Sequence, residues 1–254
     1  MKTTDNTILI TGGATGIGLE LAKEFVAKNN TVIICGRREA KLSEAKKILP
    51  QVITYQCDIS DIHQRRKLFE FCTQEHPDIN ILVNNAGIQR EINFLNGEAD
   101  YLSGDSEIAI NFEACIHLIS LFVPYFSKRS EAAIVNVTSG LGIVPLHITP
   151  VYCATKAGLH SFSVSLRSQL QNTSIKVFEL IPPIVDTELD RGARDRRGQK
   201  DKGIKPEIVS KEALKGLSND QLEMPVGIVK LLQIGSRIAP SLFLKIINKK
   251  VATP

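Results

Sequence analysis

Apolar and polar positions follow a repeating order along most of the chain. Six short runs are rich in β-branched residues, and the first two are almost continuously apolar, as expected of parallel strands buried on both faces. They occupy residues 7–11, 31–35, 52–56, 80–84, 132–138 and 175–181. Between them, the spacing of apolar side chains predicts helices near 17–29, 39–48, 61–75, 106–128 and 152–172.

The regular order of strand and helix predicts a single α/β domain over residues 1–254, with a doubly wound parallel β-sheet and helices on both faces. No repeat, low-complexity tract or linker divides the chain. Residues 188–206 are too polar for a core and interrupt the pattern. Residues 207–254 are predicted to be a C-terminal helical segment, with no further strand after residue 206.

Composition and charge argue against several classes of protein. The formal net charge of +4 is too small to predict a nucleic-acid partner. From the sequence we expect no apolar run that reaches the length of a membrane span, and the N-terminal run leads directly into a glycine loop, unlike a signal peptide. The five cysteines are far apart and form no C-x-x-C pair, so the sequence predicts neither a disulfide framework nor a metal site. These features favour a reduced, cytoplasmic protein.

A glycine-rich loop, TGGATGIG at 11–18, follows the first predicted strand and opens the first predicted helix. Gly12, Gly16 and Gly18 stand where a backbone turns tightly, approaches a pyrophosphate and packs a helix against a sheet. The helix N-terminus that follows offers free N–H groups to phosphate. A glycine-rich turn without a ligand is the alternative, but the strand–loop–helix context favours a dinucleotide.

Tyr152 and Lys156 lie four residues apart in VYCATKAG, 151–158, at the start of a predicted helix. One helical turn brings the two side chains together, which on its own fits a solvated helix face as well as a proton-transfer pair. A free tyrosine titrates near pH ~10, whereas efficient proton transfer favours a pKa near ~7. A lysine cation at an assumed separation of about 5 Å would supply roughly 3 kcal/mol toward that difference.

Taken together, the ordered motifs resemble the short-chain dehydrogenase/reductase family. The glycine loop is followed by NNAG at 84–87, by Asn111, by Ser139 at the end of NVTSG, and by the Tyr152–Lys156 pair. Four motifs in this order are far more specific than any one of them. Stretches such as NNAGIQREINF and VYCATKAGLHSFS look like the DltE-type oxidoreductases of this family, a subgroup that brings no established substrate.

The resemblance implies a Rossmann-like fold and an NAD(P)-dependent oxidoreductase that interconverts an alcohol and a carbonyl. Tyr152 would be the general acid/base, Ser139 would orient the substrate oxygen, and Lys156 would hold the nicotinamide ribose. Asn111 would hold a water that relays protons from Lys156; the alternative is a helix residue that binds backbone. The implied cofactor-binding residues are Gly12, Gly16, Ile17, Gly18, Arg37, Arg38, Asp58, Ile59, Asn85, Ala86, Gly87, Tyr152, Lys156, Pro182, Ile184 and Thr187.

The residues after the second predicted strand favour NADP over NAD. Gly36 stands where NAD-preferring relatives carry an acid, and Arg37 and Arg38 follow it. An arginine fork suits the dianionic 2′-phosphate of NADP. Thr15 replaces a basic residue found in many NADP-preferring relatives, so NAD stays open as a cofactor. Pro183 replaces the glycine of the family's nicotinamide-binding segment and restricts the local backbone to φ near ~−65°.

Residues 188–206 begin directly after Thr187 and carry seven cations against four acids. Few apolar side chains are available to anchor them, so they are predicted to form a mobile lid over the substrate. Their charge favours a substrate that carries a carboxylate or phosphate. A solvated loop without substrate preference fits the composition equally well.

The C-terminal stretch 227–250 is apolar with interspersed cations. Such a stretch could lie on an anionic membrane surface, but a helix pair that covers the edge of the sheet is the favoured interpretation. By resemblance, the protein is also predicted to be a homodimer or homotetramer, paired through the helices at 112–128 and 152–172.

Two other functions fit parts of the sequence. A non-catalytic NADP-sensing regulator needs only the nucleotide half of the site, so the complete set of four catalytic residues argues against it. A sugar-nucleotide epimerase or dehydratase uses the same tyrosine–lysine pair, but such chains are usually longer and carry a G-x-x-G-x-x-G loop.

Overall fold

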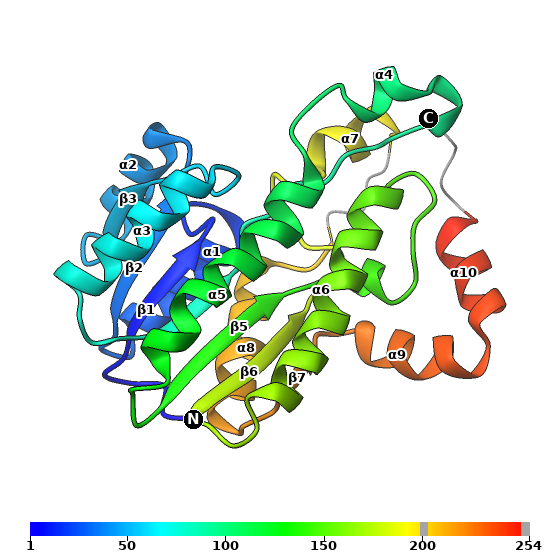
Figure 1. The fold of residues 1–254 in the computed structure, drawn as a ribbon. Helices are drawn as coiled ribbons and strands as arrows, with labels where there is room; N and C mark the ends of the chain where they lie inside the picture. Colours follow the sequence, from blue (N-terminus) through cyan, green and yellow to red (C-terminus); the bar gives the residue numbers. More distant parts are fainter. Residues whose placement is uncertain (199–202, 250–254) are drawn as a thin grey trace.

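Seven parallel strands form one sheet in the computed structural model, which describes residues 1–198 and 203–249 (Figure 1). The strands lie in the order β3-β2-β1-β4-β5-β6-β7. Their bounds are β1 Thr7–Thr11, β2 Thr31–Gly36, β3 Ile53–Gln56, β4 Ile79–Asn84, β5 Ala132–Val137, β6 Ile175–Ile181 and β7 Glu223–Pro225. The strand order reverses direction between β1 and β4, so a crevice is expected at the carboxyl ends of these two strands.

The central strands are buried on both faces, which explains their continuous apolar runs. In β1, Ile8 and Ile10 belong to the core on one face of the sheet, whereas Leu9 belongs to the core on the other. All three side chains are fully buried. A strand of this kind has no polar face, so its sequence shows no alternation.

Helices cover both faces and complete the predicted doubly wound, Rossmann-like arrangement (Figure 1). One face is covered by α1 Gly16–Val26, α2 Glu39–Ile48 and α8 Pro206–Ser218, and the other by α3 Ile62–Glu75, α5 Ala114–Phe126 and α6 Pro150–Gln169. The remaining helices are η1 Phe94–Asn96, α4 Glu98–Tyr101, η2 Ala109–Glu113, η3 Gly140–Gly142, α7 Arg191–Arg196, α9 Val229–Ile238 and α10 Pro240–Asn248.

The expectation that no strand follows residue 206 is wrong. β7 pairs in parallel with β6 and places Met224 opposite Leu180 and Pro225 opposite Ile181. With only three residues, β7 is too short to produce a recognisable apolar pattern. Pro225 also argues against a strand in sequence, but β7 is the last strand of the sheet, where a missing N–H is tolerated.

One helical stretch also differs from expectation. Within the described residues, Ala109–Phe126 is long and apolar enough to cross a membrane by length and composition, although the sequence pattern suggested no such run. Of this stretch 44% is buried. Its side chains Leu118, Phe122 and Phe126 belong to the core between α5 and the sheet.

The five cysteines are all buried and free. Cys35, Cys57 and Cys72 lie in the core between the sheet and α3. Burial raises the pKa of the Cys57 thiol to about 12, so this side chain is held as a neutral, apolar group.

Candidate active site

The glycine loop joins β1 to α1 in a turn that leaves no room for a side chain at Gly12 or Gly18. Gly12 and Gly16 have φ values of +64° and +55°, which favour glycine. A Cβ on Gly12 would lie 2.8 Å from the Cα of Ala86, and a Cβ on Gly18 would lie 2.4 Å from the carbonyl oxygen of Gly12. The loop, the NNAG segment and the start of α1 are therefore packed backbone to backbone.

Hydrogen bonds that centre on Thr11 connect the NNAG segment to this turn. The Thr11 hydroxyl accepts hydrogen bonds from the backbone N–H groups of Asn85, at 3.0 Å, and Ala86, at 3.1 Å. The Asn85 side chain in turn donates to the carbonyl oxygens of Thr11 and Gly12. These hydrogen bonds thus hold the carboxyl ends of β1 and β4 together.

A cavity of about 1050 Å³ lies along the carboxyl ends of the strands. Two predicted site residues, Gly18 and Asn111, do not line it. The predicted residues that do are Gly12, Gly16, Ile17, Arg37, Arg38, Asp58, Ile59, Asn85, Ala86, Gly87, Ser139, Tyr152, Lys156, Pro182, Ile184 and Thr187. The crowded glycine turn and the two arginines are the features expected of a dinucleotide site, so the residues present fit a nicotinamide cofactor.

The basic side chains at one end of the cavity form ion pairs with acidic residues whose contacts the sequence pattern did not predict. Arg37 forms an ion pair with Asp105, and Arg38 forms one with Glu188 at 3.3 Å. Lys41 lies 3.8 Å from the same Glu188 carboxylate. Both arginine side chains are about half exposed, so their guanidinium groups are accessible to an incoming anion.

Three of the predicted catalytic side chains converge at the opposite end. Lys156 and Tyr152 are buried, and the Lys156 Nζ lies 5.8 Å from the centre of the Tyr152 ring. The same Nζ donates a hydrogen bond of 2.8 Å to the carbonyl oxygen of Val137. Ser139 begins the short helix η3, and its hydroxyl accepts from the Leu141 N–H.

Burial dominates the acid–base properties of this pair. It raises the pKa of the Tyr152 phenol well above its ordinary value, while hydrogen bonding with Ser139 acts in the opposite direction. Burial also lowers the pKa of Lys156. Lys156 was expected to supply most, not all, of the shift toward pH 7. Desolvation of the phenolate is the largest influence on the Tyr152 pKa and acts in the opposite direction.

Asn111 lies behind the cavity, in the π-helical turn η2. Its side chain is fully buried, accepts from the Ile88 N–H at 2.9 Å and donates to the Ile88 carbonyl at 2.8 Å. It also donates to the Thr155 hydroxyl on α6. A Cβ on Gly87 would lie 3.3 Å from the Asn111 Oδ1 and 3.5 Å from the Lys156 Nζ. Asn111 thus links the NNAG segment to the helix that carries Tyr152 and Lys156.

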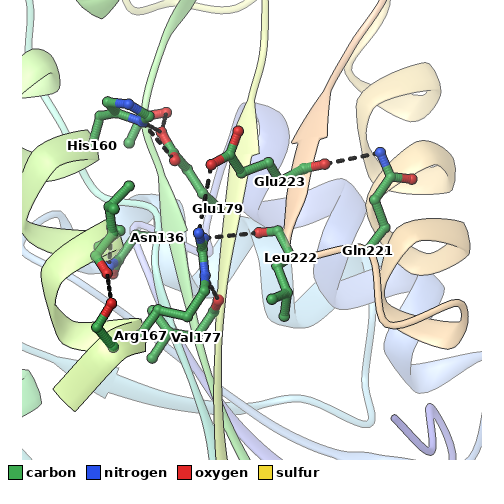
Figure 2. Close-up of polar contacts among 12 residues, drawn as sticks. Asn136, His160, Arg167, Val177, Glu179, Gln221, Leu222 and Glu223 are labelled. Carbon is green, nitrogen blue, oxygen red and sulfur yellow. Dashed lines mark hydrogen bonds and ion pairs between the residues drawn. The ribbon is translucent and has the colours of Figure 1, made fainter. Parts of the chain in front are cut away.

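A buried carboxylate supports the site from β6. Figure 2 shows His160 of α6 pointing at Glu179, with an Nδ1–Oε2 distance of 2.8 Å. The Thr138 hydroxyl donates to the same carboxylate at 2.7 Å. Because Thr138 precedes Ser139, and His160 lies one turn beyond Lys156, Glu179 holds the end of β5 and α6 together.

The sequence pattern did not reveal Glu179 or its contact with His160. Figure 2 also shows Arg167 of α6, whose guanidinium donates to the Val177 and Leu222 carbonyls. One signal was present. Glu179 is the only acid in a strand that is otherwise apolar apart from Lys176, and a buried strand acid needs partners.

The described part of 188–206 lines the cavity through Glu188, Leu189, Asp190, Arg194 and Arg197. Arg194 in α7 is buried and forms an ion pair of 3.1 Å with Asp190. The segment is thus anchored by ion pairs and also by Ile204, which packs against the core and forms backbone hydrogen bonds with Ile184 and Asp186. Residues 199–202, including the predicted lid cations Lys200 and Lys202, lie outside the described residues. That the segment moves stays a prediction.

A profile of the short chain dehydrogenase family matches residues 6–198. The chain belongs to the short-chain dehydrogenase/reductase family. It is 52% identical over 224 residues to the uncharacterized oxidoreductase DltE of Bacillus subtilis (strain 168), which covers 88% of this chain and 89% of that relative. The predicted family and the DltE-type resemblance are both confirmed, and family membership makes the protein an NAD(P)-dependent oxidoreductase.

Two further members extend the comparison. The NADP-dependent 3-hydroxy acid dehydrogenase YdfG of Salmonella typhi is 30% identical over 179 residues, covering 70% of this chain and 72% of that relative. A short chain dehydrogenase/reductase from Burkholderia phymatum, solved in complex with NAD, superimposes with a TM-score of 0.84 and covers 99% of this chain and 98% of that one. At 17% identity, the second likeness concerns the fold alone.

The His160–Glu179 contact predicts a specific pH dependence of stability. The hydrogen bond to Glu179 raises the pKa of His160 above its ordinary value of 6.5. Its stabilisation is therefore complete below about pH 6.5 and is lost as pH rises through the higher folded pKa. In urea denaturation across this window, the wild type should lose more stability than His160→Gln. Replacing the exposed His63 with glutamine should leave the wild-type slope unchanged, and equal slopes for wild type and His160→Gln would contradict the assignment.

Proposed function

We propose that the protein is an NADP-preferring oxidoreductase that interconverts an alcohol and a carbonyl, with Tyr152 as the general acid/base. The observation that carries this proposal is the convergence of Ser139, Tyr152 and Lys156 on the same cavity as the glycine turn. The nicotinamide cofactor supplies or accepts the hydride. The side chains of this chain must therefore bind the cofactor, orient the substrate oxygen and move one proton.

Each catalytic residue has a role that suits its position. Ser139 orients the substrate oxygen beside the Tyr152 phenol, which donates its proton on reduction and accepts it on oxidation. The buried Lys156 ammonium provides positive charge beside the phenolate and hydrogen bonds to the cofactor ribose. Asn111 fixes the carbonyl of Ile88 and the start of α6, next to a water that would relay protons from Lys156.

The preference for NADP rests on the charge beside β2. Arg37, Arg38 and Lys41 line the cavity, and Gly36 lacks the acid that would repel a 2′-phosphate. The NADP dependence named for the YdfG relative supports the same preference. Asp58 and Ile59 would contact the adenine, while Pro182, Ile184 and Thr187 would hold the nicotinamide.

A non-catalytic NADP sensor and a sugar-nucleotide epimerase are the weaker alternatives. A sensor does not require a buried lysine beside a buried tyrosine, since burying an ammonium is costly unless it serves the chemistry. An epimerase is disfavoured by the glycine spacing at 11–18.

The charge of the cavity favours an anionic carbonyl substrate. Arg194 and Arg197 line it beside the predicted lid. The YdfG relative is named as acting on 3-hydroxy acids, which carry a carboxylate. We also expect a homodimer or homotetramer that pairs through α5 and α6, consistent with the apolar helix Ala109–Phe126 being only partly buried.

Arg37→Ala should weaken NADP binding by about tenfold or more, because a hydrogen bond to a charged group contributes about 1.5–3 kcal/mol. NAD binding should change little. Asp105→Asn, which removes the carboxylate that competes for Arg37, should tighten NADP binding instead. Titration of each protein with both cofactors tests this, and equal losses for NAD and NADP in Arg37→Ala would refute the assignment.

Tyr152→Phe keeps the aromatic ring and removes the transferable proton. It should abolish turnover while NADP binding survives. Tyr101→Phe, in a tyrosine that does not line the cavity, should behave as wild type. Turnover is measured as oxidation of NADPH with an active carbonyl substrate, and retained activity in Tyr152→Phe would reject the phenol as the acid/base.

A matched series of neutral and anionic carbonyl compounds tests the substrate charge. We expect higher kcat/KM for the anions, and a larger loss of kcat/KM for the anions than for the neutral compounds at high salt, because screening weakens electrostatic attraction. If the two groups of substrates are used equally well at low salt, the cavity charge does not select substrate.

A further inference from the structure

The C-terminal helices α9 and α10 leave an apolar surface exposed. They lie at the side of the molecule away from β1–β3 (Figure 1). Among the described residues, seven of the nineteen exposed large apolar side chains fall between residues 228 and 246. No side chain of α10 is buried. The favoured expectation, a helix pair packed over the sheet edge, therefore does not describe this segment, because β7 already occupies that edge and α9 and α10 keep much of their apolar surface outside.

The exposed apolar side chains form a stripe with a border of cations. On α9, Leu231, Ile234 and Ile238 are spaced three and four residues apart, so they share one face. They are 59%, 63% and 79% exposed. Lys230 and Arg237 each precede a stripe residue by one position, which places both at the same flank of the stripe.

The second helix also exposes apolar side chains beside cations. Leu242 and Ile246 are one turn apart on α10 and more than half exposed, next to Lys245 and Lys249. The two helices are joined at a tight contact, where a Cβ on Gly235 would lie 2.0 Å from the ring of Phe243. We call this surface the C-terminal face, defined by Leu231, Ile234, Ile238, Leu242 and Ile246 with the cations Lys230, Arg237, Lys245 and Lys249.

The C-terminal face has positive charge without any acid. The sequence contains no aspartate or glutamate after Glu223. Within the described residues, none of the four cations forms a salt bridge. Apolar side chains flanked by unpaired cations, on a helix that lies along the surface, suit an anionic lipid interface, where cations contact headgroups and apolar groups enter the acyl boundary.

We propose that the C-terminal face binds the surface of an anionic lipid bilayer. A second copy of the chain is a poorer occupant, because a two-fold contact would bring two sets of four cations together without a carboxylate on either face. The bilayer offers the opposite charge. Leu232 of α9 and Ile247 of α10 line the catalytic cavity, so the same two helices would border both the lipid surface and the cavity.

Flotation of the full-length protein with vesicles tests the proposal. The protein should float with vesicles of phosphatidylglycerol and phosphatidylcholine, but not with phosphatidylcholine alone, and high salt should weaken binding. The triple variant Leu231→Ser, Ile234→Ser, Ile238→Ser should lose binding. Lys230→Gln with Arg237→Gln should weaken it by about thirtyfold.

Matched control variants distinguish binding through this face from binding through other exposed apolar residues or through net charge. Leu95→Ser with Leu102→Ser removes exposed apolar side chains elsewhere, and Arg66→Gln with Lys67→Gln lowers net charge equally on α3. Both should bind vesicles as the wild type does. NADPH binding by every variant shows that its fold is intact.

Three results would overturn the proposal. The first is no flotation of folded wild type with anionic vesicles, and the second is equal weakening by the Arg66/Lys67 and Lys230/Arg237 pairs. The third is a wild-type oligomer, measured by light scattering, that dissociates in the serine triple variant while vesicle binding is absent. That outcome would assign the face to a second copy of the chain.

Discussion

The buried ammonium of Lys156 is the constraint on which the site depends. Removing an unpaired cation from water costs several kcal/mol, so its position requires nearby acceptors. The described structure provides one at the Val137 carbonyl, 2.8 Å away. Gly87 adds to the close packing here, because a Cβ on it would lie 3.3 Å from the Asn111 Oδ1 and 3.5 Å from the Lys156 Nζ. The lysine can be buried only because β5, the NNAG segment and α6 meet at one point.

The same burial determines how the tyrosine behaves. Desolvation raises the pKa of Tyr152 and lowers that of Lys156, so in the protein alone the phenol is a firmly protonated donor. A neutral phenol is the form needed to protonate a carbonyl oxygen. Glu179 contributes from behind by tying Thr138 and His160 together, which keeps Ser139 and the lysine-bearing helix in register. The positions of the catalytic side chains and the protonation state of the phenol thus both depend on one packed region at the ends of β5 and β6.

The sequence correctly predicted those features that depend on residues close together in the chain. Short runs rich in β-branched residues identified six strands, and the glycine loop required backbone to approach backbone, as Gly12 and Gly18 do. The sequence did not predict contacts between residues that are far apart in the chain. Asp105 and Glu188, which hold the two arginines, and Thr138, which binds Glu179, have no local pattern that reveals their contacts. β7 was missed because three residues cannot show a period, and the pKa of Tyr152 depends on burial, which residue spacing does not report.

The central claim is that this cavity transfers a hydride from NADPH to a carbonyl carbon, and isotope transfer measures it most directly. The protein is incubated with NADPH carrying deuterium at both C4 positions and a panel of aldehydes and ketones, and the products are weighed by mass spectrometry. The account predicts that the wild type forms an alcohol that has gained one deuterium from the deuterated NADPH. The same labelled alcohol should form more slowly with deuterated NADH. Tight binding of NADPH with no deuterium in any product of a broad panel would contradict it and would favour a nucleotide sensor.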